Sequence, residues 1–332
     1  MARRVAINGF GRIGRGVLRA IVERGSDLEV VAINDLTDAG TLAHLLARDS
    51  IYGALGQPVS VDGTTLVVGD RRIHTFDESD PTKLPWGELG VEVVLEATGR
   101  FTRAEDAKQH ITAGAQRVLV SAPAKGADLT VVLGVNDDLY DPEQHRIVSN
   151  ASCTTNALAP LAKVLDDLAG IEWGSMMTVH AYTQDQRLQD APHQDLRRAR
   201  AAALNVIPTS TGAATAIGLV LPQLDGKLVG GSLRVPVPVG SIVELTAMVS
   251  REVTRDEVLA AYRDAAEGPL AGVLEYSEEP LVSSDIVANP HSSIFDSELT
   301  YAEGKHVKVT AWYDNEWGFS QRAAEALELM AG

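Results

Sequence analysis

The chain has 332 residues, of which 45% are hydrophobic and 22% are charged, and its formal net charge at pH 7 is −16. This length suits two domains, and this composition predicts a soluble protein with a packed core. An acidic surface repels polyanions, so the charge argues against nucleic acid and anionic membrane surfaces as partners.

The first half of the chain alternates short apolar segments with helical ones. It begins directly in an apolar strand without a signal-peptide core, and no run is long enough to span a membrane, so we expect a cytoplasmic protein. A helix is predicted at Arg12–Arg24, and a hairpin at 65–76 that turns at Gly69 and Asp70. Six β-branched-rich segments have the pattern of strands buried on both faces of a parallel sheet, namely 4–8, 28–34, 91–97, 117–121, 129–133 and 146–150. The alternation predicts a doubly wound α/β (Rossmann) domain over residues 1–150.

The second half has longer strands in which apolar and polar residues alternate. Alternation is typical of an antiparallel sheet that is covered on one face. A helix over 254–266 begins with a capping box, and a last helix is predicted near 318–330. We therefore predict a second, mostly antiparallel α+β domain over 151–315, catalytic in role, with the C-terminal segment 316–332 joining the first domain. The alternating strands are 175–183, 241–250 and 306–314.

A dinucleotide fingerprint, G-x-G-x-x-G, lies between the first predicted strand and the first helix, at Gly9, Gly11 and Gly14. In such a motif the first glycine permits a tight turn, the second lets the backbone approach a pyrophosphate, and the third allows close helix packing. Asp35 ends the second strand, 21 residues after Gly14, and a carboxylate there favours NAD over NADP. The alternative is a glycine-rich turn of a doubly wound fold that binds another ligand.

The only cysteine, Cys153, stands in the segment S-N-A-S-C-T-T-N before an apolar helical run. A single cysteine excludes an internal disulfide and a cysteine-based zinc cluster, and we expect no metal. A helix N-terminus lowers a thiol pKa, so the position favours a thiolate nucleophile, with oxyanion stabilisation from the Cys153 amide and the Asn156 region. His180, on the strand 175–183, is a candidate base. The alternative is that Cys153 is a small buried hydrophobic residue and His180 a half-buried structural histidine.

Several ordered motifs give the chain a close resemblance to one family. They are I-N-G-F-G-R-I-G-R, V-L-E-A-T-G, S-N-A-S-C-T-T-N, V-H-A-Y-T, P-T-S-T-G-A-A, L-R-V-P-V-P and W-Y-D-N-E-W-G-F-S. The chain resembles the bacterial, type I, phosphorylating glyceraldehyde-3-phosphate dehydrogenases nearly from end to end. The resemblance implies oxidation of D-glyceraldehyde 3-phosphate by NAD with inorganic phosphate, giving 1,3-bisphosphoglycerate in glycolysis or gluconeogenesis. It implies Cys153 as nucleophile, His180 as the base that activates it, and a homotetramer assembled through the second domain.

The resemblance also implies the binding residues. On the cofactor side they are Arg12 and Ile13 at the pyrophosphate, Asp35 at the ribose, Thr98 and Ser121 near the nicotinamide, and Asn315 at its carboxamide. The substrate phosphate site consists of Thr183 and Arg234. The site for inorganic phosphate consists of Ser152, Thr154, Arg198, Thr211 and Gly212. The residues agree with these roles, because 209–218 reads as a hydroxyl-rich helix start and Arg234 lies on a strand.

The chain departs from the usual family pattern at Ala157, Thr215, Ser79 and the segment 237–241. One hypothesis is a specialised isozyme that resists electrophiles directed at Cys153, and neutral drift explains the same changes equally well. Two other functions stay open. The first is an erythrose-4-phosphate dehydrogenase, which hydrolyses its thioester instead of transferring it to phosphate. The second is a binding or regulatory protein that keeps the fold without catalysis.

Overall fold

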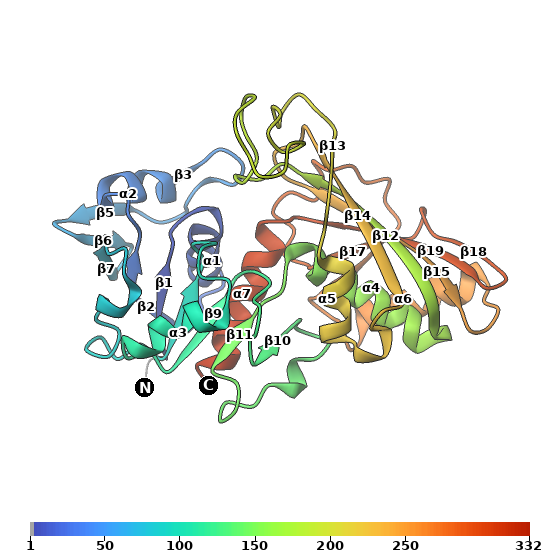
Figure 1. The fold of residues 1–332 in the computed structure, drawn as a ribbon, viewed down its shortest axis with the longest axis horizontal. Coiled ribbons are helices and arrows are strands. Elements are labelled where there is room, and N and C mark those ends of the chain that lie inside the picture. The colour runs from blue at the N-terminus through green and yellow to red at the C-terminus, as the bar shows by residue number, and fades with distance from the viewer. Residues whose placement is uncertain (1–2) are drawn as a thin grey trace. The chain divides into compact units, whose positions relative to one another are not determined.

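The computed structural model describes residues 3–332, and these residues form two compact units (Figure 1). Within the described part, unit 1 comprises the residues up to Val131, Asp138–Ala151 and Ser320–Gly332. Unit 2 comprises Val132–Asp137 and Ser152–Phe319. Each unit is built around one large sheet, and the chain returns to unit 1 at its C-terminal end.

Unit 1 contains a nine-stranded sheet in the order β10-β11-β9-β8-β1-β2-β7-β6-β5. All neighbours are parallel except β7 with β6 and β6 with β5, and the predicted hairpin at 65–76 is confirmed as β6 and β7. The strands are β1 (Arg3–Asn8), β2 (Leu28–Asn34), β5 (Val59–Asp62), β6 (Thr65–Val68), β7 (Arg71–Phe76), β8 (Val93–Glu96), β9 (Arg117–Val120), β10 (Leu129–Thr130) and β11 (Ile147–Ser149). The helices are α1 (Arg12–Glu23), α2 (Ala39–Ala47) and α3 (Ala104–Thr112), and a short pair β3 (Arg48–Asp49) and β4 (Gly53–Ala54) follows α2.

The central strands of unit 1 are buried on both faces, which explains their unbroken apolar sequence. Val5, Ile7 and Leu95 on β1 and β8 are fully buried. The chain order runs outward from β1 in two directions, through β2 on one side and through β8 and β9 on the other. This is the doubly wound pattern that the sequence predicts, and its point of reversal is where such folds bind dinucleotides.

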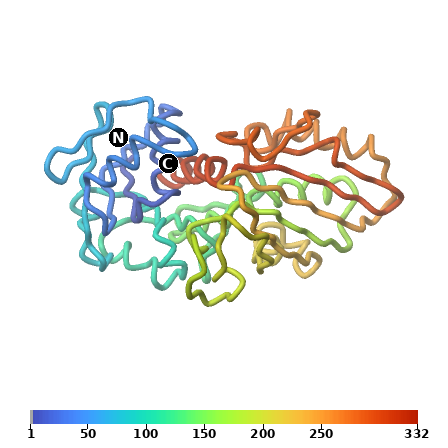
Figure 2. The backbone as a smooth tube through the Cα atoms, turned by 90° about the horizontal axis from the view of Figure 1, so that it is seen from above, coloured from blue at the N-terminus to red at the C-terminus, as the bar shows by residue number. Residues whose placement is uncertain are grey.

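The C-terminal helix α7 (Trp317–Met330) packs against α1 within unit 1, as Figure 2 shows for the red helix beside the blue segments. A Cβ atom on Gly16 of α1 would lie 2.5 Å from Ser320 Oγ, so the missing side chain permits the close approach. Arg24, just after α1, forms an ion pair with Glu325. Arg117 NH1 donates a hydrogen bond to Met330 O at 2.9 Å, which ties the end of α7 to β9.

Unit 2 contains an eight-stranded sheet in the order β13-β14-β12-β15-β19-β17-β16, with β18 beside β19. Two neighbouring pairs, β12 with β14 and β16 with β17, are parallel and the others are antiparallel. The strands are β12 (Ile171–Ala181), β13 (Ile207–Thr209), β14 (Leu228–Val235), β15 (Ser241–Val249), β16 (Leu274–Ser277), β17 (Ser293–Asp296), β18 (Tyr301–Glu303) and β19 (His306–Tyr313). The helices are α4 (Cys153–Ala169), α5 (Ala213–Val220) and α6 (Arg255–Glu267). The predicted fold class, a parallel doubly wound sheet with a second mostly antiparallel one, is confirmed.

The alternation along β12 separates two faces of the unit 2 sheet. Met176, Thr178 and His180 are buried on the face where α4 packs, whereas Trp173 and Met177 on the other face are exposed. The capping box predicted at the start of α6 is present, since Thr254 and Glu257 each accept the other's backbone N–H. None of the helices over residues 3–332 is long and apolar enough to cross a membrane.

Candidate active site

Four of the residues predicted to bind the cofactor lie at one edge of the unit 1 sheet. Gly9, Asp35 and Ser121 come directly after β1, β2 and β9, and Thr98 is the second residue after β8. These strands are neighbours in the order β9-β8-β1-β2 and run parallel, so their carboxyl ends share an edge. Ligands of doubly wound sheets bind at that edge.

The glycine loop has the shape that a dinucleotide requires. Gly9 has φ +93°, and a Cβ atom there would lie 2.6 Å from the backbone nitrogen of Thr98. A Cβ on Gly14 would lie 2.1 Å from Gly9 O, whereas a Cβ on Gly11 would meet nothing within 4 Å. Two glycines therefore permit close packing and the third faces open space, where the backbone is free to approach a pyrophosphate. The residues present fit NAD.

Asp35 anchors the glycine loop to the end of β2. Its Oδ2 accepts a hydrogen bond from the Phe10 amide at 2.8 Å, and its Oδ1 accepts one from the Thr37 amide at 3.0 Å. Arg12 opens α1, and its guanidinium forms an ion pair with the buried carboxylate of Asp49. Ile13 follows in the same first turn and is partly exposed.

Thr98 is held by a buried network of polar side chains around Glu96. Glu96 at the end of β8 is 2% exposed, and its Oε1 accepts hydrogen bonds from the amide and the hydroxyl of Thr98. Its Oε2 accepts one from Asn8 Nδ2 at 2.6 Å and lies 3.0 Å from His110 Nε2. Trp86 Nε1, which can only donate, donates to His110 Nδ1 at 3.0 Å, so the histidine proton lies on Nε2 and points at the carboxylate.

Cys153 and His180 face one another within unit 2. Ser152 is the N-cap of α4, because its Oγ accepts a hydrogen bond from the Thr155 amide at 3.0 Å, and this makes Cys153 the first residue of the helix. The Sγ atom of Cys153 lies 3.3 Å from Nε2 of His180, which sits near the end of β12. A thiol and a basic nitrogen at this distance form the pairing expected of an activated nucleophile.

The hydrogen bonds fix which nitrogen of His180 carries the proton. Its Nδ1 lies 2.6 Å from Ala181 O, and a carbonyl oxygen can only accept, so Nδ1 is protonated and donates. The Nε2 atom therefore presents its lone pair to the Cys153 sulfur. The imidazole is oriented as the acceptor of the thiol proton.

The protonation state of this pair differs from the sequence-based expectation. Burial raises the pKa of the Cys153 thiol, although the Arg234 guanidinium and the amides at the start of α4 lower it. The helix effect has the expected sign, but the cost of burying a charge outweighs it. Burial, followed by the charge of Arg234, lowers the pKa of His180 to about 3. Burial thus opposes ionisation of both side chains, and the pKa of the Cys153 thiol is raised where the sequence analysis expected the helix field to lower it.

The Asn156 side chain lies against the first turn of α4. It is 2% exposed, and its Nδ2 donates to Ser152 O at 3.0 Å. The amide nitrogen therefore braces the first turn of α4. An oxyanion beside Cys153 would rely on backbone N–H groups at the helix start.

Two residues predicted to bind the substrate phosphate lie in contact. Arg234 NH1 donates to Thr183 Oγ1 at 2.6 Å and to Ala181 O at 3.2 Å. Among the described residues, the buried Nε atom of Arg234 has no hydrogen-bond partner. A buried donor without a partner costs free energy, which an anion at this position would offset.

The residues predicted for inorganic phosphate fall into two groups within unit 2. Arg198 Nε donates to Thr209 Oγ1 at 2.9 Å, near the end of β13. Thr211 Oγ1 accepts from the Ala213 amide at 3.2 Å, and Gly212 is the N-cap of α5 with open space where a Cβ would lie. Ser152 and Thr154 belong instead to the start of α4.

Tyr313 connects the start of α4, which carries Ser152 and Thr154, with β12, which carries His180. Its hydroxyl lies 2.9 Å from Thr154 Oγ1 and 2.8 Å from Thr178 Oγ1, and its ring packs edge-on to His180. Burial raises the pKa of the Tyr313 hydroxyl above its usual value, so the phenol stays protonated. The sequence analysis did not assign this residue, although it stands inside the motif W-Y-D-N-E-W.

Asn315, predicted to meet the nicotinamide, is 4% exposed. Its Oδ1 accepts hydrogen bonds from Ser241 Oγ at 3.0 Å and from the Gly240 amide at 3.2 Å. Ser241 Oγ in turn accepts from the Ala181 amide at 3.1 Å. Asn315 is thereby linked to the strand end that carries His180.

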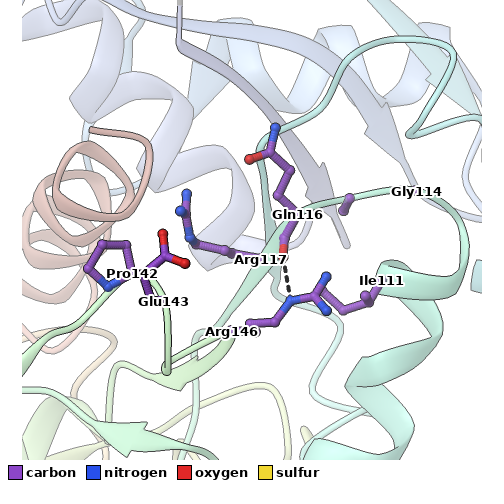
Figure 3. A pocket seen from close by; sticks show the side chains of 8 residues that line it. Ile111, Gly114, Gln116, Arg117, Pro142, Glu143 and Arg146 are labelled. Carbon is purple, nitrogen blue, oxygen red and sulfur yellow. Dashed lines mark hydrogen bonds between the residues drawn. The ribbon is translucent and has the colours of Figure 1, made fainter.

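A pocket of about 480 Å³ lies elsewhere in unit 1 (Figure 3). Its lining includes Arg117, the first residue of β9, and Gln116 and Arg146, which immediately precede β9 and β11. Figure 3 shows the side chain of Glu143 beside that of Arg117. The pocket thus opens at the amino ends of the parallel strands, and none of the predicted site residues lines it.

The fold, the residues at the strand edge of unit 1 and the residues around Cys153 and His180 in unit 2 together define a two-domain, NAD-dependent oxidoreductase. A family profile described as "Glyceraldehyde 3-phosphate dehydrogenase, NAD binding domain" matches residues 3–104, and one described as "Glyceraldehyde 3-phosphate dehydrogenase, C-terminal domain" matches residues 152–315. The chain therefore belongs to the glyceraldehyde-3-phosphate dehydrogenase family.

Curated relatives cover the chain from end to end. A protein named "Glyceraldehyde-3-phosphate dehydrogenase" from Kitasatospora aureofaciens is 71% identical over 328 residues, which is 99% of each chain. "Glyceraldehyde-3-phosphate dehydrogenase 1" of Streptomyces avermitilis is 58% identical over 332 residues, covering 100% of this chain and 99% of the relative. The protein of that family from Mycolicibacterium smegmatis is 57% identical over 337 residues, 99% of each chain. These relatives do not favour the alternative of an erythrose-4-phosphate dehydrogenase.

Proposed function

We propose that this enzyme oxidises D-glyceraldehyde 3-phosphate with NAD and inorganic phosphate, giving 1,3-bisphosphoglycerate through a thioester on Cys153. The observation that carries the proposal is the pair of Cys153 Sγ and His180 Nε2 at 3.3 Å, with the proton of the histidine fixed on Nδ1. Cys153 is the catalytic nucleophile and His180 the catalytic base. Unit 1 is the cofactor domain, and unit 2 is the catalytic domain.

The first step forms a bond between Sγ and the aldehyde carbon. His180 Nε2 takes the thiol proton as the sulfur attacks, and the proton passes to the carbonyl oxygen to give a hemithioacetal. Because His180 is neutral, its lone pair is available at the pH of the reaction. Backbone N–H groups at the start of α4 stabilise the developing oxyanion.

The second step converts the adduct to a thioester and releases the product. NAD, when bound, supplies the acceptor for the hydride that leaves the carbon. His180 takes the hydroxyl proton as the carbon–oxygen double bond forms again. Inorganic phosphate then attacks the thioester carbon, the carbon–sulfur bond breaks, and His180 returns its proton to Sγ.

Thr183 and Arg234 hold the phosphate of the substrate in this proposal. The unpartnered, buried Nε of Arg234 and the fork geometry of a guanidinium support this role. Inorganic phosphate is assigned to Ser152, Thr154, Arg198, Thr211 and Gly212. In a chain of net charge −16, such local sites must capture the anionic ligands against the overall field.

NAD is held by the glycine loop of unit 1 and by the residues along the same strand edge. Gly9, Gly11 and Gly14 shape the loop, and the carboxylate of Asp35 meets the ribose. The other cofactor residues in this proposal are Arg12, Ile13, Thr98, Ser121 and Asn315. The guanidinium of Arg12 is paired with Asp49. The pyrophosphate would therefore be bound by the backbone amides in the first turn of α1.

A single-turnover measurement of NADH formation tests the reaction. We expect one equivalent per site without phosphate, and steady turnover only when phosphate or arsenate is added. Equal steady turnover without either anion would indicate a hydrolysed thioester, as in erythrose-4-phosphate dehydrogenase. A Cys153→Ser variant that keeps its fold and its cellular role would favour a non-catalytic binding protein instead.

Resistance to electrophiles is a further proposal, motivated by the departures at Ala157 and Thr215. Ala157 is fully buried in α4 on the helix that begins with Cys153, and Thr215 is exposed on α5. Incubation with an epoxide that mimics the substrate tests the idea, with an ordinary family member as reference. Inactivation at the same rate in both enzymes would reject it and leave neutral drift as the explanation.

A homotetramer is proposed on the exposed face of the unit 2 sheet. Trp173 and Met177 on β12, Val229 on β14 and Met248 on β15 are exposed, and their register places them on one face. Large apolar side chains gathered on an uncovered sheet face are typical of an interface between subunits. Light scattering after gel filtration tests this, and a monomer at micromolar concentration would reject it.

A further inference from the structure

Asp185 lies two residues after Thr183, and its carboxylate joins groups that the proposed function assigns to two different anions. Its Oδ1 accepts a hydrogen bond from Thr183 Oγ1. Its Oδ2 accepts one from Arg198 NH1 at 2.5 Å, which is also an ion pair. Thr183 belongs to the substrate phosphate site and Arg198 to the site for inorganic phosphate.

The same carboxylate lies within the electrostatic reach of the third cationic group. Arg234 donates to Thr183 Oγ1 at 2.6 Å, so a chain of hydrogen bonds runs from Arg234 through Thr183 to Asp185. Burial lowers the pKa of the Arg234 guanidinium. The charge of Asp185 raises this pKa, whereas Arg198 lowers it further by like-charge repulsion. The carboxylate thus balances two guanidinium groups that repel one another.

Asp185 carries its negative charge under ordinary conditions. Its hydrogen bond from Thr183 and the charges of Arg234 and Arg198 hold the pKa of the carboxyl below its usual value, against the opposing effect of burial. The side chain is 41% exposed, so the carboxylate is able to turn away from its partners into solvent. The Asp185 carboxylate therefore lies beside both proposed anion sites and is bound by one donor from each, Thr183 and Arg198.

We propose that Asp185 is a specificity-determining residue that competes with bound anions for Thr183 and Arg198. A phosphate dianion carries enough charge and acceptor oxygens to replace the carboxylate at both donors. A small monoanion offers no more charge than Asp185 and gains little by replacing it. The residue therefore weakens the binding of monoanions more than that of phosphates. This inference rests on the proposed function for the identity of the anions that are selected.

The single cysteine provides a direct test, because alkylation of a thiol in this chain reports only on Cys153. Iodoacetate is a monoanion and iodoacetamide is its neutral analogue, and both form the same kind of carbon–sulfur bond with release of iodide. The ratio of their second-order rate constants cancels changes in the intrinsic reactivity of the thiol. In the Asp185→Asn variant, we expect the rate constant for iodoacetate, divided by that for iodoacetamide, to rise about tenfold. The reason is that the variant lacks a negative charge that repels iodoacetate.

Asp190→Asn is the matched control. Asp190 lies in the same connecting segment and pairs with the exposed Arg200, so the variant loses the same charge away from the donors of the anion sites. Its alkylation ratio should stay within twofold of the parent. A second substitution, Asp185→Ser, removes the charge with a different side chain and should raise the ratio in the same direction. An unchanged or lower ratio in both Asp185 variants would overturn the proposal.

A steady-state measurement separates competition from a structural role. In Asp185→Asn the KM for inorganic phosphate should fall several-fold, while kcat stays equal or decreases. A residue that merely holds Arg198 in place would raise the KM when it is removed. The alkylation ratio needs neither NAD nor turnover, so it can support the inference even if phosphate-dependent NADH formation fails and the proposed function is rejected.

Discussion

His180 and Arg234 are Cα partners in the parallel ladder between β12 and β14, so a cation faces the His180 imidazole from the adjacent strand. The charge of Arg234 lowers the pKa of His180, and it also lowers the pKa of the Cys153 thiol. One side chain thereby favours the neutral form of His180 and the ionised form of Cys153. If Arg234 holds a phosphate as proposed, a bound dianion would offset its positive charge. The ligand would then weaken the effect of Arg234 on the pKa values of His180 and Cys153.

Replacing Arg234 by leucine should shift the reactivity of Cys153 to higher pH. Loss of the cation removes a group that lowers the thiol pKa, so that pKa rises and less thiolate is present at any given pH. We expect alkylation by the uncharged reagent iodoacetamide at pH 7 to slow roughly threefold to tenfold. Arg200→Leu, at an exposed ion pair, serves as the control and should leave the profile in place. A shift to lower pH would contradict this account.

His180→Asn should reduce kcat by roughly 10²- to 10⁴-fold, the usual contribution of a positioned acid–base group. Asparagine can still donate to Ala181 O, but it has no basic nitrogen to take the thiol proton. NAD affinity, measured by fluorescence titration, should stay within twofold of the parent. The exposed His306 on β19 provides a control substitution that should leave kcat unchanged. A kcat within threefold of the parent in His180→Asn would show that another group takes the proton.

Asp35→Asn should relax the preference for NAD over NADP. Asparagine retains an oxygen that can accept the Phe10 amide bond, so the glycine loop keeps its anchor while the negative charge is lost. We expect the KM for NADP to fall at least about tenfold because the carboxylate no longer repels a 2′-phosphate. Asp27→Asn removes the same charge at an exposed position and should change neither KM. Unchanged discrimination in Asp35→Asn would place the selectivity elsewhere.

His110→Ala should destabilise unit 1 by roughly 2–4 kcal/mol. The substitution leaves Trp86 Nε1 without its acceptor and removes one of the donors to the buried Glu96 carboxylate. Urea unfolding monitored by tryptophan fluorescence measures the loss. The exposed His74 on β7 is the control, and its replacement by alanine should change stability by no more than about 0.5 kcal/mol. A stability loss no larger than that of the control would mean that water satisfies the freed groups.

The central strands of unit 1 are readable from sequence because burial on both faces leaves an unbroken apolar signal. The predicted segments 28–34 and 117–121 agree with β2 and β9 to within one residue. The segment 129–133 forms a strand only at Leu129–Thr130, because β10 is a short edge strand with a single neighbour. Hydrophobic content alone does not report where ladder hydrogen bonds end.

The meeting of Thr183 with Arg234 was predictable only through the family resemblance. The two residues are 51 positions apart and come together because β14 pairs in parallel with β12. No local periodicity encodes such a pairing between strands that are not consecutive. The thiol pKa was missed for a related reason, since the degree of burial around Cys153 depends on packing that the adjacent residues do not specify. A local signal for Asp185 did exist, namely a carboxylate placed just after the histidine strand among residues implied to bind anions.

The contacts of α7 with α1 and β9 bear on the order in which the chain acquires its structure. Ser320 fills the space beside Gly16, and Arg117 binds the last turn of the helix at Met330. A nascent chain emerging from the ribosome has made all of β1 to β11 long before these residues exist. One flank of α1 therefore stays uncovered until the residues from Ser320 to Met330 have been synthesised.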